Sequence, residues 1–329
     1  KSSVKIFLTM SSLSSPLSRA RESVCSFLMK NKIVVIAGAT GKLGRLVVQS
    51  LLAHPGVVVR ALVRDPAKAG DLKGDRVELV AFDVATSSEQ ERAAAVKGAF
   101  AVVSTLQGGP DVIIDAQLAL LQAAKAAGVR RFIPSDYSYN IFTLPKGINV
   151  NSDWRRAFAE KAHSERSDEF EVVHVLQGIF ADRGVLGFLG LLDAERGIIR
   201  HWGDGTTPID WTTWEDTARF TAAAAIDDRP VPEHLFVSGD RLDVLTFVKT
   251  WEKVHGKTLV VQRLGSLEDL ARETNRALAE QPQNMMAWLP LMYARGTFGG
   301  EALLGPLENQ RYPEIKPETV EQAMRRNAV

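Results

Sequence analysis

Residues 33–44 read Ile-Val-Val-Ile-Ala-Gly-Ala-Thr-Gly-Lys-Leu-Gly, and this stretch decides the fold. The apolar run from Ile33 to Ala37 is long enough for a buried strand, and the spacing Gly38-x-x-Gly41-x-x-Gly44 follows at once. Apolar residues then recur at helical spacing up to Leu52. A strand, a glycine turn and a helix in series direct backbone N–H groups at a pyrophosphate. We therefore predict dinucleotide binding, with an ordinary βα turn that binds no ligand as the alternative.

Alternating strand and helix patterns continue after the glycine turn. Such alternation predicts a doubly wound parallel sheet of the NAD(P)-binding Rossmann type over residues 30–180. Beyond residue 180 the rhythm breaks, so residues 181–329 are predicted to form a smaller, mostly helical substrate lobe with some return to the Rossmann sheet. The expected strands are 33–37, 57–63, 77–82, 99–104, 129–133 and 170–176, with a helix over 111–127.

Charge and cysteine content narrow the class of protein. Forty Lys and Arg residues balance 39 Asp and Glu residues, which gives no electrostatic footprint for nucleic acid or a membrane surface. A single cysteine, Cys25, excludes an intrachain disulfide framework and a cysteine-based zinc site. The six histidines show no ligand spacing, so no metal is predicted. The expected partner is a small molecule, and the expected state is a monomer or homodimer.

The first residues differ from the rest of the chain. Residues 1–28 contain nine serines and four basic residues against one acid, Glu22. This composition fits an organellar transit peptide, and residues 1–29 are expected to be a disordered or targeting extension. We favour the simpler interpretation that Met29 is the natural start, because the first strand begins only four residues later. That interpretation predicts a cytoplasmic protein.

Two positions after the second and third predicted strands bear on which dinucleotide binds. An NAD site usually carries an acid at the end of the second strand, but Arg64 stands there. A guanidinium suits a 2′-phosphate, and Lys42 in the glycine turn is expected to add a second positive charge, so NADP(H) is predicted. Asp65 keeps NAD as the alternative. Asp83 is predicted either to meet the adenine or to cap the following helix.

Several motifs in series resemble the isoflavone-reductase-like and NmrA-like branch of atypical short-chain dehydrogenases, from about Met29 to the C-terminus. They are Gly38-Ala-Thr-Gly-Lys-Leu-Gly44, Arg64, Val103-Ser-Thr105, Arg131-Phe-Ile-Pro-Ser-Asp136, Gly203-Asp-Gly205, Trp214-Glu-Asp216, Trp251 to Lys257 and Arg311 to Lys316. The resemblance implies a Rossmann domain preferring NADPH and hydride transfer to a small aromatic or conjugated substrate. The rival function is a non-catalytic, redox-sensing regulator that binds NADP(H) and acts on a protein partner. The cofactor-binding candidates are Gly38, Thr40, Gly41, Lys42, Leu43, Gly44, Arg64, Asp83, Thr105 and Ser135.

The proton-handling residue is the least determined part of the site. The resemblance implies a lysine in the helix before the sixth strand, for which Lys161 is the candidate. Counting back from Gly178-Ile-Phe180 places the expected position nearer Phe158, one helical turn away. Tyr137 is a second catalytic candidate, with a role as an aromatic wall as the alternative. Tryptophans at 202, 211 and 214 are predicted to lie in the core of the second lobe or to line its cleft.

Overall fold

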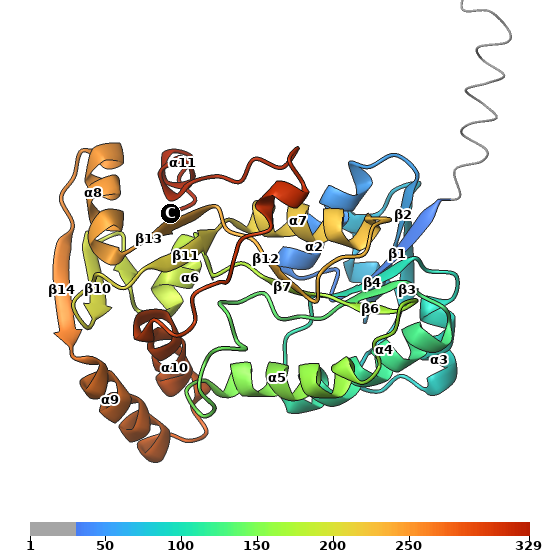
Figure 1. Ribbon diagram of the computed structural model, residues 1–329, viewed down its shortest axis with the longest axis horizontal. Coiled ribbons are helices and arrows are strands. Elements are labelled where there is room, and N and C mark those ends of the chain that lie inside the picture. The colour runs from blue at the N-terminus through green and yellow to red at the C-terminus, as the bar shows by residue number, and fades with distance from the viewer. Residues whose placement is uncertain (1–30) are drawn as a thin grey trace, which may run out of the picture.

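A computed structural model describes residues 31–329, so the expected N-terminal extension, residues 1–29, lies outside the described part (Figure 1). Six parallel strands form the main sheet in the order β3-β2-β1-β4-β5-β6. This is the order of a doubly wound Rossmann sheet, and it confirms the predicted fold class. The strands are β1 (Lys32–Ala37), β2 (Val57–Val63), β3 (Val77–Ala81), β4 (Ala101–Ser104), β5 (Arg131–Ile133) and β6 (Glu171–Val172).

Helices cover both faces of this sheet, because its central strands present apolar side chains in both directions. On β1, Val34 and Ile36 pack toward one face, together with Val47 and Phe220. Val35 packs toward the other face, where Phe158 is among its neighbours. Figure 1 shows the two helical layers on opposite sides of the sheet. The first layer holds α2 (Lys42–Leu52) and α7 (Trp214–Ile226), and the second holds α3 (Glu89–Val96), the π-helix η3 (Asp111–Ala116), α4 (Gln117–Ala126) and α5 (Val150–His163).

The predicted strand over residues 170–176 is divided into two elements. β6 pairs with β5, and after Val173 the chain continues as β7 (His174–Leu176), which pairs in parallel with β12 (His234–Phe236). The second half of the chain therefore returns to the Rossmann layers through β12 and α7. A domain boundary at residue 180 stays a prediction, since these two elements lie beyond it.

The remaining elements build a second core beside the Rossmann sheet, with two three-stranded sheets of order β14-β10-β9 and β13-β11-β8. No helix among residues 31–329 is long and apolar enough to cross a membrane. The strands are β8 (Ile179–Phe180), β9 (Leu192–Asp193), β10 (Ile198–Trp202), β11 (Ile209–Thr212), β13 (Asp240–Leu242) and β14 (Val260–Gly265). The helices are α6 (Arg183–Phe188), α8 (Val244–His255), α9 (Leu267–Glu280), α10 (Met285–Gly299) and α11 (Val320–Arg325), and the 3-10 turns are η1 (Pro66–Lys68), η2 (Gly70–Leu72) and η4 (Asn309–Arg311).

Candidate functional site

The glycine turn between β1 and α2 uses its three glycines in different ways. Gly38 has φ of +83°, and a Cβ there would lie 2.9 Å from the Thr105 carbonyl oxygen. A Cβ on Gly44 would lie 2.3 Å from the Gly38 carbonyl oxygen, so the helix approaches the turn only without a side chain. A Cβ on Gly41 would meet only that same oxygen, at 3.4 Å. Protein packing therefore requires glycine at 38 and 44. At 41 a side chain would enter the cavity that Gly41 lines.

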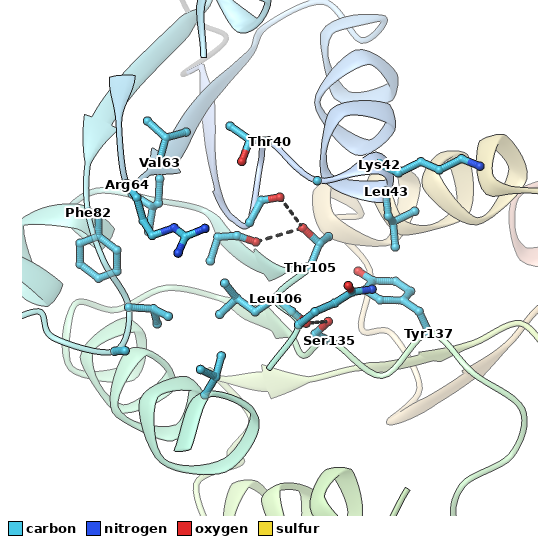
Figure 2. Close-up of a pocket in the computed structure, with 18 of the residues that line it drawn as sticks. Thr40, Lys42, Leu43, Val63, Arg64, Phe82, Thr105, Leu106, Ser135 and Tyr137 are labelled. Atoms are coloured by element: carbon cyan, nitrogen blue, oxygen red, sulfur yellow. Dashed lines mark hydrogen bonds between the residues drawn. The ribbon is translucent and has the colours of Figure 1, made fainter. Parts of the chain in front are cut away.

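A cavity of about 490 Å³ lies at the carboxyl ends of the sheet strands (Figure 2). This is the edge where doubly wound sheets bind ligands, beside the switch point between β1 and β4. Every predicted cofactor-binding residue except Gly44 lines it, and so does Tyr137. Those that line it are Gly38, Thr40, Gly41, Lys42, Leu43, Arg64, Asp83, Thr105 and Ser135.

The end of the cavity beside β2 and β3 carries a free guanidinium. Arg64 follows β2 and extends into the cavity in Figure 2, and no hydrogen bond or ion pair of the described residues involves it. The neighbouring Asp65 has a local structural role. Its carboxylate accepts a hydrogen bond from the Ala67 backbone N–H at 3.0 Å and so caps the N-terminus of η1. Asp65 does not line the cavity, so the acid that kept NAD as the alternative is not presented to a ligand there.

Asp83 and Thr105 shape the loops around this end. The Asp83 carboxylate accepts from the Ala85 N–H at 3.0 Å, and α3 is capped instead by Ser88, with which Glu91 completes a capping box. The prediction that Asp83 caps the helix is therefore wrong, since the helix begins later than the turn. Thr105 donates to the carbonyl oxygens of Ala37 and Gly38, both at 3.1 Å, so it ties the end of β4 to the glycine turn.

Lys42 lies at the other end of the cavity from Arg64. Its side chain extends away from Arg64 in Figure 2, and its Nζ lies 2.6 Å from Asp182 Oδ2 and 4.8 Å from the centre of the Trp214 ring. Trp214 in turn stacks on Phe180, with the ring centres 3.6 Å apart. The expectation that Lys42 and Arg64 converge on one phosphate is not met, because Asp182 and Trp214 draw the ammonium toward the second half of the chain.

The tryptophans divide between the two roles considered from the sequence. Trp211 is buried in the second core and donates from its indole nitrogen to the Leu242 carbonyl at 3.0 Å. Trp202 packs at the edge of the same core. Trp214 lines the cavity instead, together with Phe180. No pattern distinguishes Trp214 from the others, because its position follows from the docking of α7 on α2.

Tyr137 presents its ring to the cavity but not its hydroxyl. The hydroxyl is buried and has no hydrogen-bond partner among residues 31–329. Burial raises the pKa of Tyr137 well above its ordinary value, and the Asp136 carboxylate adds to the increase. Its backbone φ is +31°, an unusual value for a side chain of this size. This geometry favours Tyr137 as an aromatic wall over Tyr137 as a proton donor, and its role stays a prediction.

Asp136 and His174 form a buried pair behind that wall. His174 Nδ1 lies 2.6 Å from Asp136 Oδ2, and neither side chain is more than 1% exposed. Asp136 follows β5 and His174 lies on β7, so the pair joins the end of the main sheet to the strand that β12 extends. The pair was not predicted from the sequence, since the two residues are 38 positions apart and no motif links them.

The structure does not bring Lys161 to the cavity. Its side chain is 52% exposed, and Nζ lies 3.9 Å from the Asp115 carboxylate of η3. Phe158, the position expected from counting, is fully buried and packs near Phe132 with ring centres 6.3 Å apart. The cation of α5 that does line the cavity is Arg155. Arg155 was not predicted from the sequence, because the family resemblance implies a lysine in this helix.

The parallel sheet, the glycine turn and the cavity beside it define a Rossmann-type protein. Residues 29–289 match the NmrA-like family, and the chain belongs to it. It is 29% identical over 323 residues to the isoflavone reductase homolog IRL of Zea mays, covering 90% of this chain and 98% of that protein. It is 26% identical over 267 residues to the bifunctional pinoresinol-lariciresinol reductase 1 of Linum usitatissimum, covering 75% of this chain and 83% of that protein.

A solved structure shares this fold over nearly the whole chain. The structure of AtPrR2 with NADP+ and (+)pinoresinol matches with a TM-score of 0.70 and 21% identity, covering 90% of this chain and 98% of that one. Together with the sequence relatives, this similarity confirms the resemblance noted from the motifs and places the chain among proteins related to reductases.

Proposed function

We propose that this protein is an NADPH-dependent reductase that transfers a hydride to a small aromatic or conjugated substrate. The observation that carries the proposal is the Arg64 guanidinium, which lies in the same cavity as the glycine turn and has no ion pair or hydrogen bond with residues 31–329. A cation without a counter-charge at the end of β2 suits the 2′-phosphate that distinguishes NADP(H) from NAD(H). The relatives named as reductases and the neighbour solved with NADP+ support the same cofactor and chemistry.

The residues around the cavity fit this cofactor. Lys42 and Leu43 open α2, so their backbone N–H groups have no intrahelical acceptor and are free to hold the pyrophosphate. Gly41 leaves room for the phosphates to approach, and Arg64 would hold the 2′-phosphate. When bound, NADPH supplies the hydride. Ser135 lies at the end of β5, on the half of the sheet where the nicotinamide is expected, and the ring of Tyr137 is the adjoining wall.

Cofactor choice tests the proposal directly. NADPH should bind at least tenfold tighter than NADH, a difference of about 1.4 kcal/mol. Arg64→Ala should remove most of that difference and leave NADH affinity nearly unchanged, as measured by fluorescence titration. Lys42→Met is a useful companion, because Lys42 faces Asp182 and its loss should leave the preference for NADPH intact. Equal affinities for the two cofactors in the unmodified protein would refute the assignment.

A regulator that binds NADP(H) without turnover is the second candidate. The exposed position of Lys161 and the buried hydroxyl of Tyr137 favour it, since neither group presents a proton to the cavity. Absorbance of NADPH, followed with a panel of enones, quinones and phenylpropanoid-like aromatics, separates the two functions. Tight NADPH binding without oxidation of NADPH by any compound would support the regulator.

A further inference from the structure

Arg155 is a cation in the cavity without a carboxylate partner. It is half-buried on α5, and no acidic side chain of residues 31–329 forms an ion pair with it. Its Nε donates to the Ser135 carbonyl oxygen at 3.0 Å, and its Nη1 donates to the Asn151 carbonyl oxygen at 3.0 Å. These two bonds fix the guanidinium plane, and both N–H groups of Nη2 remain without a hydrogen bond to the described residues.

The one fully buried arginine among residues 31–329, Arg131, is neutralised by a carboxylate. Its Nε lies 2.7 Å from the Glu171 carboxylate. Removing a cation from water without a counter-charge is costly, so a fixed and unpaired guanidinium in a cavity suits an anionic ligand. Asp136, a carboxylate residue of the cavity lining that directly follows Ser135, is already held by His174.

Arg155 lies beside a different strand of the sheet from the one where the phosphates are expected. The pyrophosphate is expected at the end of β1, whereas Arg155 is held by Ser135 at the end of β5. In the sheet β4 stands between them, and two strand spacings amount to about 10 Å. Arg155 therefore lies on the half of the cavity assigned to the nicotinamide and the substrate.

We propose, building on the proposed reductase function, that Arg155 binds the carbonyl oxygen of a conjugated substrate, an enone or a quinone, and stabilises the negative charge that this oxygen acquires on reduction. The substrate carbon accepts the hydride with its electron pair, the conjugated π electrons shift, and the C=O bond becomes a C–O⁻ group held by Nη2. A proton from water then completes the product. A guanidinium is suited to this role because it stays charged and gives up no proton at working pH.

A chromophoric phenol tests this role without turnover. 4-Nitrophenol resembles the oxyanion of the reduced substrate, and its absorbance reports whether it is bound as phenol or phenolate. In the complex with NADP+, the bound ligand should prefer the phenolate form at least tenfold more than free nitrophenol does, which is one pKa unit. Arg155→Gln should abolish that shift, and Arg155→Lys should retain part of it. Arg276→Gln, which removes an exposed cation of α9, should leave the shift unchanged.

Kinetics and cofactor binding supply the second readout. Arg155→Gln should lower kcat for a naphthoquinone or a cinnamoyl ketone by roughly 10²-fold or more, the scale of losing one oxyanion-stabilising donor. NADPH affinity should stay within about twofold. The ratio of kcat in the unmodified protein to kcat in Arg155→Gln should be the same at each pH from 6 to 9. Lys42, Asp136 and Tyr137 also line the cavity, but none of them replaces the guanidinium.

Each contrary outcome has a distinct meaning. A tenfold or greater loss of NADPH affinity in Arg155→Gln would make Arg155 a cofactor anchor and overturn the inference. An unshifted nitrophenol, or no binding of nitrophenol to the NADP+ complex, would overturn it while leaving the reductase function standing. Failure of the unmodified protein to bind NADPH would instead refute the proposed function itself.

Discussion

The two glycines that flank the start of α2 allow packing and ligand binding to be separated. Gly41→Ala places a methyl group 3.4 Å from the Gly38 carbonyl oxygen, an ordinary contact, and the Gly41 backbone has φ of −71° and ψ of 167°, which alanine adopts freely. Gly44→Ala places the same methyl group 2.3 Å from that oxygen and 2.9 Å from Ala39 Cα. The two variants add identical atoms to the same turn.

The expected magnitudes follow from these contacts. Alanine at 41 should leave the free energy of unfolding unchanged or raise it by up to about 0.5 kcal/mol, since it restricts the unfolded chain. Alanine at 44 needs the turn to move by roughly 1 Å against buried backbone, and such overpacking costs about 3 kcal/mol. For NADPH binding we expect the larger effect from the variant at 41, because position 41 borders the cavity. The methyl group at 41 occupies the approach of the pyrophosphate, so NADPH affinity should fall at least tenfold, or about 1.4 kcal/mol.

Urea unfolding followed by circular dichroism gives the stabilities, and NADPH fluorescence gives the affinities. Gly41→Ala is the decisive variant, because it should be folded and stable yet weak in binding. Unchanged NADPH affinity in this variant would refute the assignment of the turn as the pyrophosphate site. Unchanged stability of Gly44→Ala would show that the helix does not need its close approach to the turn.

Three further substitutions test other parts of the structure. Glu171→Gln leaves the fully buried Arg131 without its counter-charge, so urea unfolding should show a loss of roughly 3 kcal/mol. Burial alone would raise the pKa of Asp227, but hydrogen bonds from two arginines, including Arg311, outweigh it and lower that pKa. Stability from this group is therefore present above about pH 4 and lost as pH falls further, and Asp227→Asn should flatten the decline seen in acid unfolding curves. Lys161→Ala should lower turnover by about 10²-fold or more only if α5 rearranges to bring the ammonium to the substrate; turnover unchanged within twofold would remove Lys161 as a catalytic candidate.

The residues of the half of the cavity proposed to hold the adenosine and phosphates could be brought together from the sequence. These residues follow directly after strands β1, β2 and β4, and strand ends are fixed by buried apolar runs that stop at Gly38, Arg64 and Thr105. Because parallel strands all end at one edge, residues distant in the chain are brought together without any knowledge of side-chain contacts. The direction of the Lys42 side chain was not predictable, since Asp182 and Trp214 come from the second half of the chain.

Helix α5 shows why the other half of the site was harder to predict. An α-helix turns about 100° per residue, and the buried side chains Phe158, Ala159 and Ala162 define one stripe that faces the sheet. Arg155 lies near the centre of that stripe, whereas Lys161 lies about 120° from it. Lys161 lies about one helical turn after Phe158, but this spacing does not place its side chain on the buried face of α5. The stripe passes from the core at Phe158 to the cavity at Arg155, so the cation at its centre marks the point where α5 leaves the core and borders the cavity.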